Sequence, residues 1–294
     1  MRPQVVIVAT LVLNAALFGV NLVIASLSGS RAVLAQAIYA LTDLVGGALL
    51  LWGLYVSRKP ADYQYPFGRG KERFFWAFVS IVVTFSVAGV IALVTGFDQL
   101  VAPQPIGHIG EALLVVGATV LVSVASILVS LRELRLSRQS LSTFLSSAQQ
   151  GLKSIFYQDL VTIAAAIVAF GGLVLVYRTH DYAIDGATAA LEGFLLVATG
   201  FVLTAESREY LVGRALAPTE ARAILERVQR DTRVRKVRAL QSMLLGPDDA
   251  LLALRINFQD GLTTDQIEAA IDQVTADLRS SYPLLRHIVI EPES

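Results

Sequence analysis

The sequence of 294 residues contains no cysteine and only three histidines. The absence of cysteine excludes disulfides, thiolate metal sites and cysteine nucleophiles, and three histidines leave few nitrogen ligands for a soft metal. An excess of charge of one sign is also missing, because 24 lysines and arginines balance 24 aspartates and glutamates. A chain with zero net charge has no overall basic field to attract nucleic acid, so no nucleic-acid partner is expected.

Charged residues of either sign are few. They make up 16% of the chain, whereas hydrophobic residues make up 54% and the mean hydropathy is +0.60. This apolar excess is too large for an ordinary soluble domain and predicts a protein embedded in a lipid bilayer. Crossing a hydrocarbon core of about 30 Å takes roughly 20 apolar residues. Six stretches are long enough: Val5–Ala25, Val33–Val56, Phe74–Phe97, Ala112–Leu131, Ile155–Val176 and Tyr182–Ala205.

Lysine and arginine concentrate in two of the connections between these predicted spans. Five follow the second span and four follow the fourth, whereas the other connections contain only Arg31 and Arg178. Cationic flanks stay on the cytoplasmic side of a membrane. Both chain termini, and everything after the sixth span, are therefore predicted to be cytoplasmic.

From Glu209 onward the composition becomes that of a small soluble domain. The apolar spacing predicts a helix, two strands, a helix that opens with the capping pattern Thr263-x-x-Gln266, and a last strand. This αββαβ order is typical of a two-layer domain with helices against one face of a sheet. The sequence thus predicts a transmembrane domain over residues 1–208 and a tail domain over 209–294. The predicted tail elements are Thr219–Arg230, Val234–Leu245, Ala250–Phe258, the helix from Thr263 and His287–Glu291.

Three acidic residues stand out inside the predicted spans, namely Asp43, Asp159 and Glu192, with Asp185 one or two turns before Glu192. An aspartate at the centre of a spanning helix costs about 2.5–3.5 kcal/mol, so each acid needs a reason to be there. Tyr39 lies one helical turn before Asp43, and Gln158 directly precedes Asp159. Spans two and five are therefore predicted to form a polar cluster.

Each intramembrane acid has a simpler explanation, as a structural hydrogen-bonding group that pairs with a neighbouring helix. Asp185, near a membrane boundary, is expected to be a solvated helix start. Asn14 and Asn21 lie seven residues apart on one face of the first span, where their amides are expected to bond to a neighbouring helix.

Two motifs resemble those of the cation diffusion facilitator family. They are ALTD at 40–43 in the second span and KPADYQYPFGRGKE at 59–72 in the cytoplasmic connection after it. The segments KERFFW at 71–76 and LLGPDD at 244–249 are similar to the branch that contains the mitochondrial zinc-transporter-nine type. The resemblance extends over nearly the whole chain.

The resemblance implies a membrane all-α domain of six transmembrane helices and a cytoplasmic α+β tail with a ferredoxin-like fold. It also implies a homodimeric proton antiporter of the inner, or plasma, membrane of a bacterium that exports divalent cations, with no enzymatic activity and no prosthetic group. The four transport-site positions of the family fall here on Tyr39, Asp43, Ile155 and Asp159. In the cytoplasmic loop, the second-site positions fall on Asp62, Tyr65 and Arg69.

Carboxylate, phenol and amide oxygens form a harder set of ligands than the nitrogen and sulfur that zinc favours. Such a set suits Mg²⁺ or Mn²⁺, and the candidate transported cations are Mn, Mg, Fe or Zn, exchanged for protons. Because the four transport-site positions do not all have the usual ligands of the family, two other hypotheses stay open. One is a transport-incompetent homologue that acts as a scaffold or regulator, and the other is a carrier of another ion or of protons alone. The candidate metal ligands are Asp43, Asp159, Tyr39, Gln158, Glu192 and Asp62.

Overall fold

The computed structural model describes residues 3–136 and 150–293. The chain divides into two compact units. The first contains Met1–Leu54 and Phe75–Ser207, and the second contains Tyr55–Phe74 and Arg208–Ser294. The loop after the second predicted span therefore groups with the tail, although the sequence assigned it to the first domain. The transport and dimerisation roles of the two domains stay predictions.

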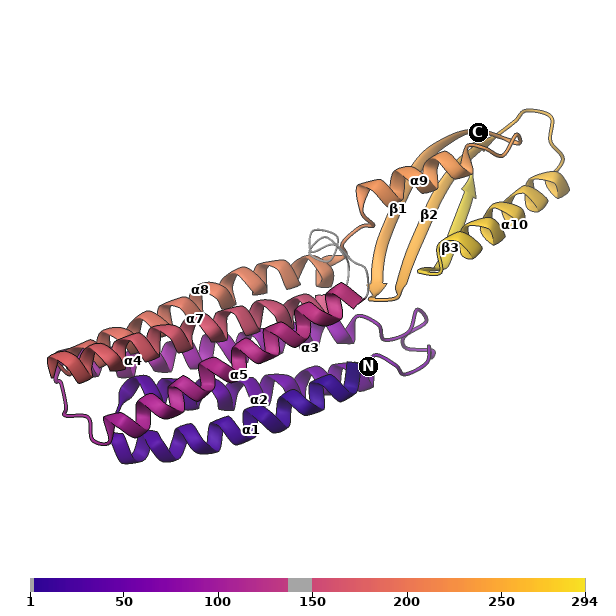
Figure 1. Cartoon of the computed structure of the whole chain (residues 1–294). Helices are drawn as coiled ribbons and strands as arrows, with labels where there is room; N and C mark the ends of the chain where they lie inside the picture. Colours follow the sequence, from indigo (N-terminus) through magenta and orange to yellow (C-terminus); the bar gives the residue numbers. More distant parts are fainter. Residues whose placement is uncertain (1–2, 137–149, 294) are drawn as a thin grey trace. The chain divides into compact units, whose positions relative to one another are not determined.

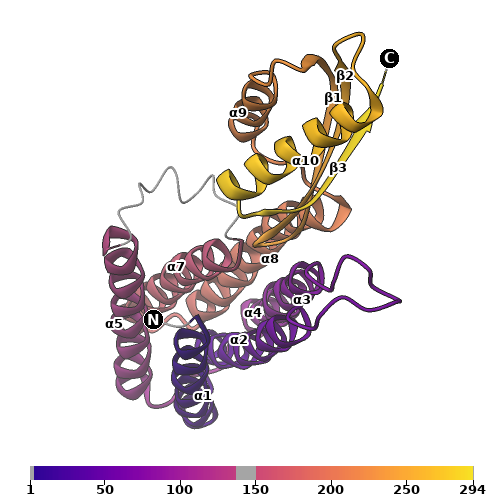
Figure 2. The ribbon, with the colours of Figure 1, turned by 90° about the vertical axis from the view of Figure 1, so that its right-hand side faces the viewer.

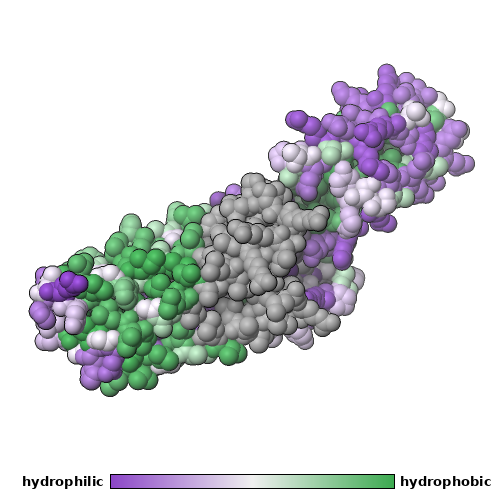
Figure 3. All heavy atoms as spheres, in the orientation of Figure 1, coloured by the Kyte–Doolittle hydropathy of each residue, from purple (hydrophilic) through white to green (hydrophobic). Residues whose placement is uncertain are grey.

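The first unit consists of long helices (Figure 1). Within the described residues, three are long and apolar enough to cross a membrane, namely Arg31–Val56, Glu72–Val101 and Ala183–Val212. Where Figure 3 colours this unit, hydrophobic side chains dominate its surface, as lipid contact requires. The helices are α1 (Pro3–Ser28), α2 (Arg31–Val56), α3 (Glu72–Ile81), the π-helix η1 (Val82–Val87), α4 (Ala88–Val101), α5 (Ile109–Leu136), α7 (Gln150–Thr179) and α8 (Ala183–Val212).

Shorter apolar helices occur in the remaining predicted spans. They are Asn14–Ser28 in α1, Ile109–Leu121 in α5 and Ile163–Thr179 in α7. Each predicted span thus coincides with a helix, and the structure establishes a helical unit of membrane type. The count of six membrane crossings stays a prediction.

The third helical stretch is irregular, because η1 interrupts it between α3 and α4. The irregular turn is bonded to α2: the Thr84 hydroxyl donates to the Thr42 carbonyl at 3.1 Å, and the Thr42 hydroxyl lies 3.3 Å from the Thr84 carbonyl. A π-helical turn leaves carbonyl groups without their usual helical partner, and hydroxyl groups can satisfy them. These bonds lie beside Asp43, the residue that follows Thr42.

Glycines bring the backbones of α4 and α8 into direct contact. Gly89 and Gly96 of α4 face Gly186 and Gly193 of α8, with a spacing of seven residues on each helix. A Cβ added at Gly96 would lie 2.4 Å from the Ala190 nitrogen, and one at Gly193 would lie 2.6 Å from the Gly89 carbonyl oxygen. Small residues permit this close packing of membrane helices, and no larger side chain fits here without movement.

The second unit contains a three-stranded sheet in the order β1-β2-β3. The pair β1–β2 is antiparallel and the pair β2–β3 is parallel, with α10 as the crossover between the parallel strands. Both helices lie against one face of the sheet (Figure 2). This confirms the predicted αββαβ order. The elements are α9 (Pro218–Val228), β1 (Val234–Gly246), β2 (Asp249–Phe258), α10 (Thr264–Ser281) and β3 (Leu285–Pro292).

The core of the sheet domain follows from the alternation of apolar residues along β2. Leu252, Leu254 and Ile256 share one face of the strand and are buried, together with Ile224 of α9 and Leu278 of α10. At the start of α10, the predicted capping box is confirmed: the Thr263 hydroxyl accepts from the Gln266 amide, and the Gln266 side chain accepts from the Thr263 amide. Local sequence signals were therefore sufficient to predict the helices and strands of this domain.

The loop 55–74 packs on the sheet domain through backbone and ring contacts. A Cβ added at Gly70 would lie 2.5 Å from the Leu245 carbonyl oxygen, so only glycine allows this approach. The Phe67 ring meets the His287 ring edge-on, with centroids 5.1 Å apart. These contacts explain why the loop belongs to the second unit.

Candidate functional site

Asp43 lies on α2, inside the helical unit, and is half-buried. The side-chain amide of Asn14 on α1 donates a hydrogen bond to Asp43 Oδ2. The sequence predicted that Asn14 bonds to a neighbouring helix, and the structure shows that its partner is the candidate site residue. Asn21, by contrast, donates to the Leu17 carbonyl of its own helix at 2.8 Å.

Tyr39 lies one turn before Asp43 on the same face of α2 and is 4% exposed. Its ring packs on Phe85 of η1, with centroids 6.4 Å apart, in a buried cluster that also contains Leu196 of α8. The apolar surroundings fix the position of the ring. Tyr39 and Asp43 therefore occupy one interior face of α2, as the sequence predicted from their spacing.

Asp159 and Gln158 belong to α7, but their side chains fall outside the part of the chain that the structure describes. The convergence of Asp159 on Asp43 therefore stays a prediction. Among the residues that were described, no group of three or more histidine, aspartate or glutamate side chains is placed to hold a metal ion.

Glu192 lies on α8 and is 1% exposed. Its Oε2 accepts a hydrogen bond from the Gln36 side chain on α2 at 2.8 Å. Gln36 precedes Asp43 by seven residues, which corresponds to two helical turns and about 10 Å along the axis. Glu192 thus faces α2 at a different level from Asp43. Its role as a metal ligand remains untested.

Asp62, the candidate ligand in the loop, is bonded to the loop itself. One carboxylate oxygen accepts from the Tyr65 amide at 2.8 Å, and the other accepts from Arg69 Nη2 at 2.9 Å. The Arg69 guanidinium stacks on the Tyr65 ring, 4.1 Å from its centroid. Hydrogen bonding to Arg69 and to the Tyr65 amide lowers the pKa of Asp62. Both carboxylate oxygens of Asp62 therefore have donors from the loop itself, and its role as a metal ligand stays a prediction.

The expectation that Asp185 is a solvated helix start is wrong, and Asp185 has a structural role. It is 1% exposed rather than solvated, and its carboxylate lies at the start of α2. The carboxylate accepts from the Ser30 hydroxyl at 2.7 Å, the Arg31 amide at 2.7 Å and the Ala32 amide at 3.3 Å. The first amides of a helix have no partner within the helix, so an acid from α8 caps α2. No local signal pairs residues that are more than 150 positions apart.

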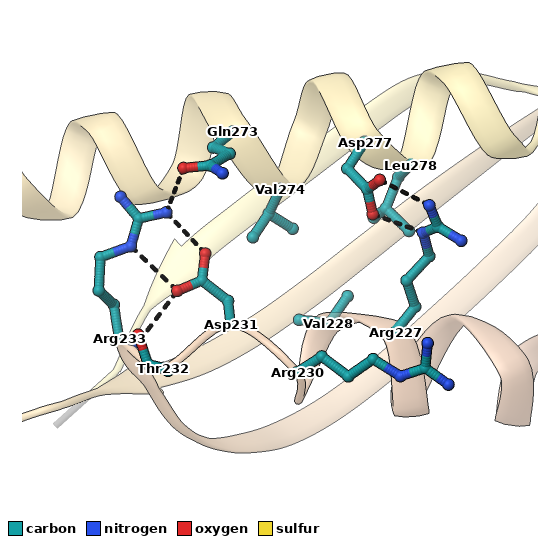
Figure 4. A pocket seen from close by; sticks show the side chains of 10 residues that line it. All are labelled: Arg227, Val228, Arg230, Asp231, Thr232, Arg233, Gln273, Val274, Asp277 and Leu278. Carbon is teal, nitrogen blue, oxygen red and sulfur yellow. Dashed lines mark hydrogen bonds and ion pairs between the residues drawn. The ribbon is translucent and has the colours of Figure 1, made fainter.

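A groove of about 560 Å³ lies in the tail between α9 and α10 (Figure 4). Arg227 of α9 makes two bonds to Asp277 of α10, at 2.5 and 2.7 Å, and these bonds lower the pKa of Asp277. Arg233 bonds to Asp231 at 2.6 Å and to Gln273 at 2.7 Å. Both carboxylates of the groove are thus neutralised by arginine, and the groove offers no carboxylate pair for a metal ion.

The structure has apolar helices with an interior carboxylate, and the same chain contains a small sheet domain. These features define an integral membrane protein of the transporter class. The model of the cation efflux transmembrane domain matches residues 7–212, which is more than half of the chain. The chain therefore belongs to the cation diffusion facilitator family. Members of this family that resemble it are transporters and not enzymes.

Three relatives illustrate the range of the family. Metal tolerance protein C4 of Arabidopsis thaliana is 25% identical over 79% of this chain and 52% of its own length. The mitochondrial proton-coupled zinc antiporter SLC30A9 of Xenopus laevis is 22% identical over 89% of this chain and 48% of its own length. Magnetosome protein MamM of Magnetospirillum gryphiswaldense is 26% identical over 76% and 67%. The chain spans about half the length of the first two.

Proposed function

We propose that this protein is a proton-coupled exporter of a divalent metal cation. The observation that carries the proposal is the position of Asp43, a carboxylate held by Asn14 between two helices of the matched transmembrane domain. An intramembrane acid that faces another helix is typical of an ion pathway. The names of two relatives, a metal tolerance protein and a proton-coupled zinc antiporter, support the same class of cargo.

The proposed cation ligands are Asp43 and Asp159, with Tyr39 and Gln158 as further oxygen ligands. Glu192 is left out of this set because it faces α2 about two helical turns from Asp43, and Asp62 is left out because Arg69 binds its carboxylate. An oxygen-only set favours Mg²⁺ or Mn²⁺, with Fe²⁺ next and Zn²⁺ least suited. The name of the antiporter relative favours zinc, so a metal panel decides between these cations.

Exchange follows from competition for the same oxygens. A cation binds only deprotonated carboxylates, so its binding expels protons, and protonation from the more acidic side expels the cation. Movement of the helices that exposes Asp43 and Asp159 alternately to the two faces then couples the two fluxes. The cation leaves the cytoplasm and protons enter it.

The proposed architecture has six spans, with α1, α5 and α7 completing those of sufficient apolar length. Both termini are cytoplasmic and the membrane is the inner, or plasma, membrane of a bacterium. The αββαβ tail is a ferredoxin-like module through which two copies dimerise. The distribution of lysine and arginine between the connections supports this orientation.

The test uses purified protein in liposomes with an internal pH dye and a panel of Mg, Mn, Fe, Co, Ni, Zn and Cd ions. One cation should drive saturable proton flux, and Asp43→Asn should abolish it. Asp98→Asn, the same change at an exposed position of α4, should leave the flux unchanged. Cation-driven flux that persists in Asp43→Asn would exclude Asp43 from the mechanism.

The position of Ile155 favours one other candidate function, a homologue that does not transport. An isoleucine has no atom that binds a cation, and it occupies one of the four positions that the family resemblance assigns to the site. An absence of proton flux with every metal of the panel would support a scaffold or regulator. Proton flux that needs no metal would instead support a carrier of protons alone.

A further inference from the structure

Glu192 of α8 is an acid that is 1% exposed within the helical unit. One oxygen, Oε2, accepts from Gln36 of α2, and the other, Oε1, is buried without a hydrogen-bond partner in the described part of the chain. A carboxylate that has lost its water needs several donors or a cation. One neutral amide is a poor substitute for them, whereas a neutral carboxylic acid has no charge to stabilise and loses far less on burial.

Among the described residues, no lysine or arginine bonds to Glu192, and the nearest along α2 is Arg31, five residues before Gln36. On α2, Gln36 bonds to Glu192, and both Gln36 and Tyr39 are buried. Helix α4, which packs on α8 through Gly89 and Gly193, has Asp98 near its end as its only charged residue. On α8 the nearest acid is Asp185, seven residues earlier. In α7, whose Gly172 meets Thr188, the segment 160–177 contains no charged residue.

Three acidic residues lie along α2, at successive positions between its first residue and its middle. Asp185 binds the amides of Arg31 and Ala32, Glu192 binds Gln36, and Asp43 is part of α2 itself. Seven residues separate Gln36 from Asp43, so the two side chains leave α2 on nearly the same face. Tyr39 lies on that face between them. Glu192 is thus placed between the start of α2 and the proposed cation site.

We propose that Glu192 is a proton-binding site, separate from the cation site, which passes protons between Asp43 and the side of the membrane on which α2 starts. When the cation leaves, the protonated Glu192 carboxyl gives up its proton and the Asp43 carboxylate gains one, by way of Tyr39, which lies on the same face of α2 between them. Glu192 then takes a proton from water on the outer side and returns to its initial state. This proposal rests on the proton-coupled export proposed above.

The first experiment measures the proton directly and needs no transport. Infrared spectroscopy of the purified protein in lipid at neutral pH should show a carboxylic acid carbonyl band that Glu192→Gln lacks. Asp98→Asn serves as the control and should keep the band. Identical spectra for the wild type and Glu192→Gln would overturn the proposal, because Glu192 would then be ionised.

The second experiment separates proton transfer from cation binding. In Glu192→Gln, cation-driven proton flux should fall by about tenfold or more, as expected when a positioned proton donor is lost. Cation affinity measured by calorimetry should stay unchanged, whereas Asp43→Asn should lose it. Glu192→Asp keeps a carboxyl group and should restore part of the flux. A flux in Glu192→Gln equal to wild type would overturn the proposal, as would a loss of cation affinity.

The results of these two experiments distinguish a failure of the role proposed for Glu192 from a failure of the proposed export function. A wild-type protein that moves no cation refutes the exporter, and the carbonyl band still decides whether Glu192 holds a proton. A wild-type protein that exchanges cation for proton just as fast without Glu192 refutes only this inference. Glutamine copies the shape and charge of a neutral acid, so failure of Glu192→Gln to fold would also contradict a neutral Glu192.

Discussion

Arg69 Nη2 lies 2.9 Å from Asp62 Oδ2, and the two side chains close the turn of the loop between α2 and α3. The turn is also closed by two reciprocal backbone bonds, from the Asp62 amide to the Tyr65 carbonyl at 3.2 Å and from the Tyr65 amide to the Asp62 carbonyl at 3.1 Å. A cation belonging to the chain itself thus neutralises the loop acid.

The ion pair should order the loop without any metal. Asp62→Ala should speed hydrogen exchange at the Tyr65 amide, since it removes the carboxylate that accepts from that amide at 2.8 Å and pairs with Arg69, and leaves only the longer bond to the Asp62 carbonyl. Asp260→Ala, which breaks the exposed pair of Asp260 with Arg235 in the tail, serves as the control and should leave the loop unchanged. Protection of Tyr65 that requires added divalent metal would contradict a loop closed by Arg69.

The pH dependence of the loop follows from the lowered pKa of Asp62. A carboxyl group whose pKa is lower in the folded state stabilises that state above its unfolded pKa, and the contribution disappears as the pH falls through the folded pKa. The order of the loop should therefore persist from neutral pH down to the ordinary aspartate range and disappear only below it. NMR titration of the Asp62 carboxyl checks this, and Arg69→Ala should move its midpoint to higher pH.

Asp185 should stabilise the fold rather than transport. Asp185→Ala leaves the amides of Arg31 and Ala32 without their acceptor, and a buried unsatisfied group costs about 1–3 kcal/mol. Thermal unfolding of the purified protein in detergent should show a lower midpoint for Asp185→Ala than for Asp98→Ala, an exposed acid. A midpoint equal to that of the wild type would mean that water replaces this cap.

The contact between α4 and α8 should tolerate no added methyl group. In Gly96→Ala the new Cβ would lie 2.4 Å from the Ala190 nitrogen, so the helices must separate at a cost of about 1–3 kcal/mol. Gly19→Ala is the matched control, because nothing lies within 4 Å of an added Cβ on that part of α1. The control should be neutral or slightly stabilising. Equal unfolding midpoints for the two variants would show that α4 and α8 adjust freely.

Part of the candidate site could be predicted from spacing alone. The positions of Tyr39 and Asp43, four residues apart, place them on one face of α2, and the structure shows that face to be interior. The partner of Asp43 could not be chosen in advance, because Asn14 and Asn21 share a helical face and have the same chemistry. Only the neighbouring helix distinguishes them: Asn14 reaches Asp43, and Asn21 bonds to its own helix.

Asp185 and Asp62 show where sequence patterns were insufficient. Both are acids close to helix ends or turns, where solvation is the ordinary expectation. The structure gives each of them specific donors, from the start of α2 for Asp185 and from Arg69 for Asp62. The donors of Asp185 lie more than 150 residues away, so no local window contains them. Arg69 is only seven residues from Asp62, and their pairing depends on how the loop between them folds.

The sequence by itself determined the helices, the strands and the membrane character of this protein, because apolar periodicity, caps and turns act within a few residues. The tertiary structure alone decided which polar groups meet. Glu192 faces Gln36, Asp185 caps α2, and glycines of α4 and α8 touch, each across a separation of about a hundred residues or more. Burial removes water from these groups, so their partners are set by which helices pack together, and this depends on the whole chain.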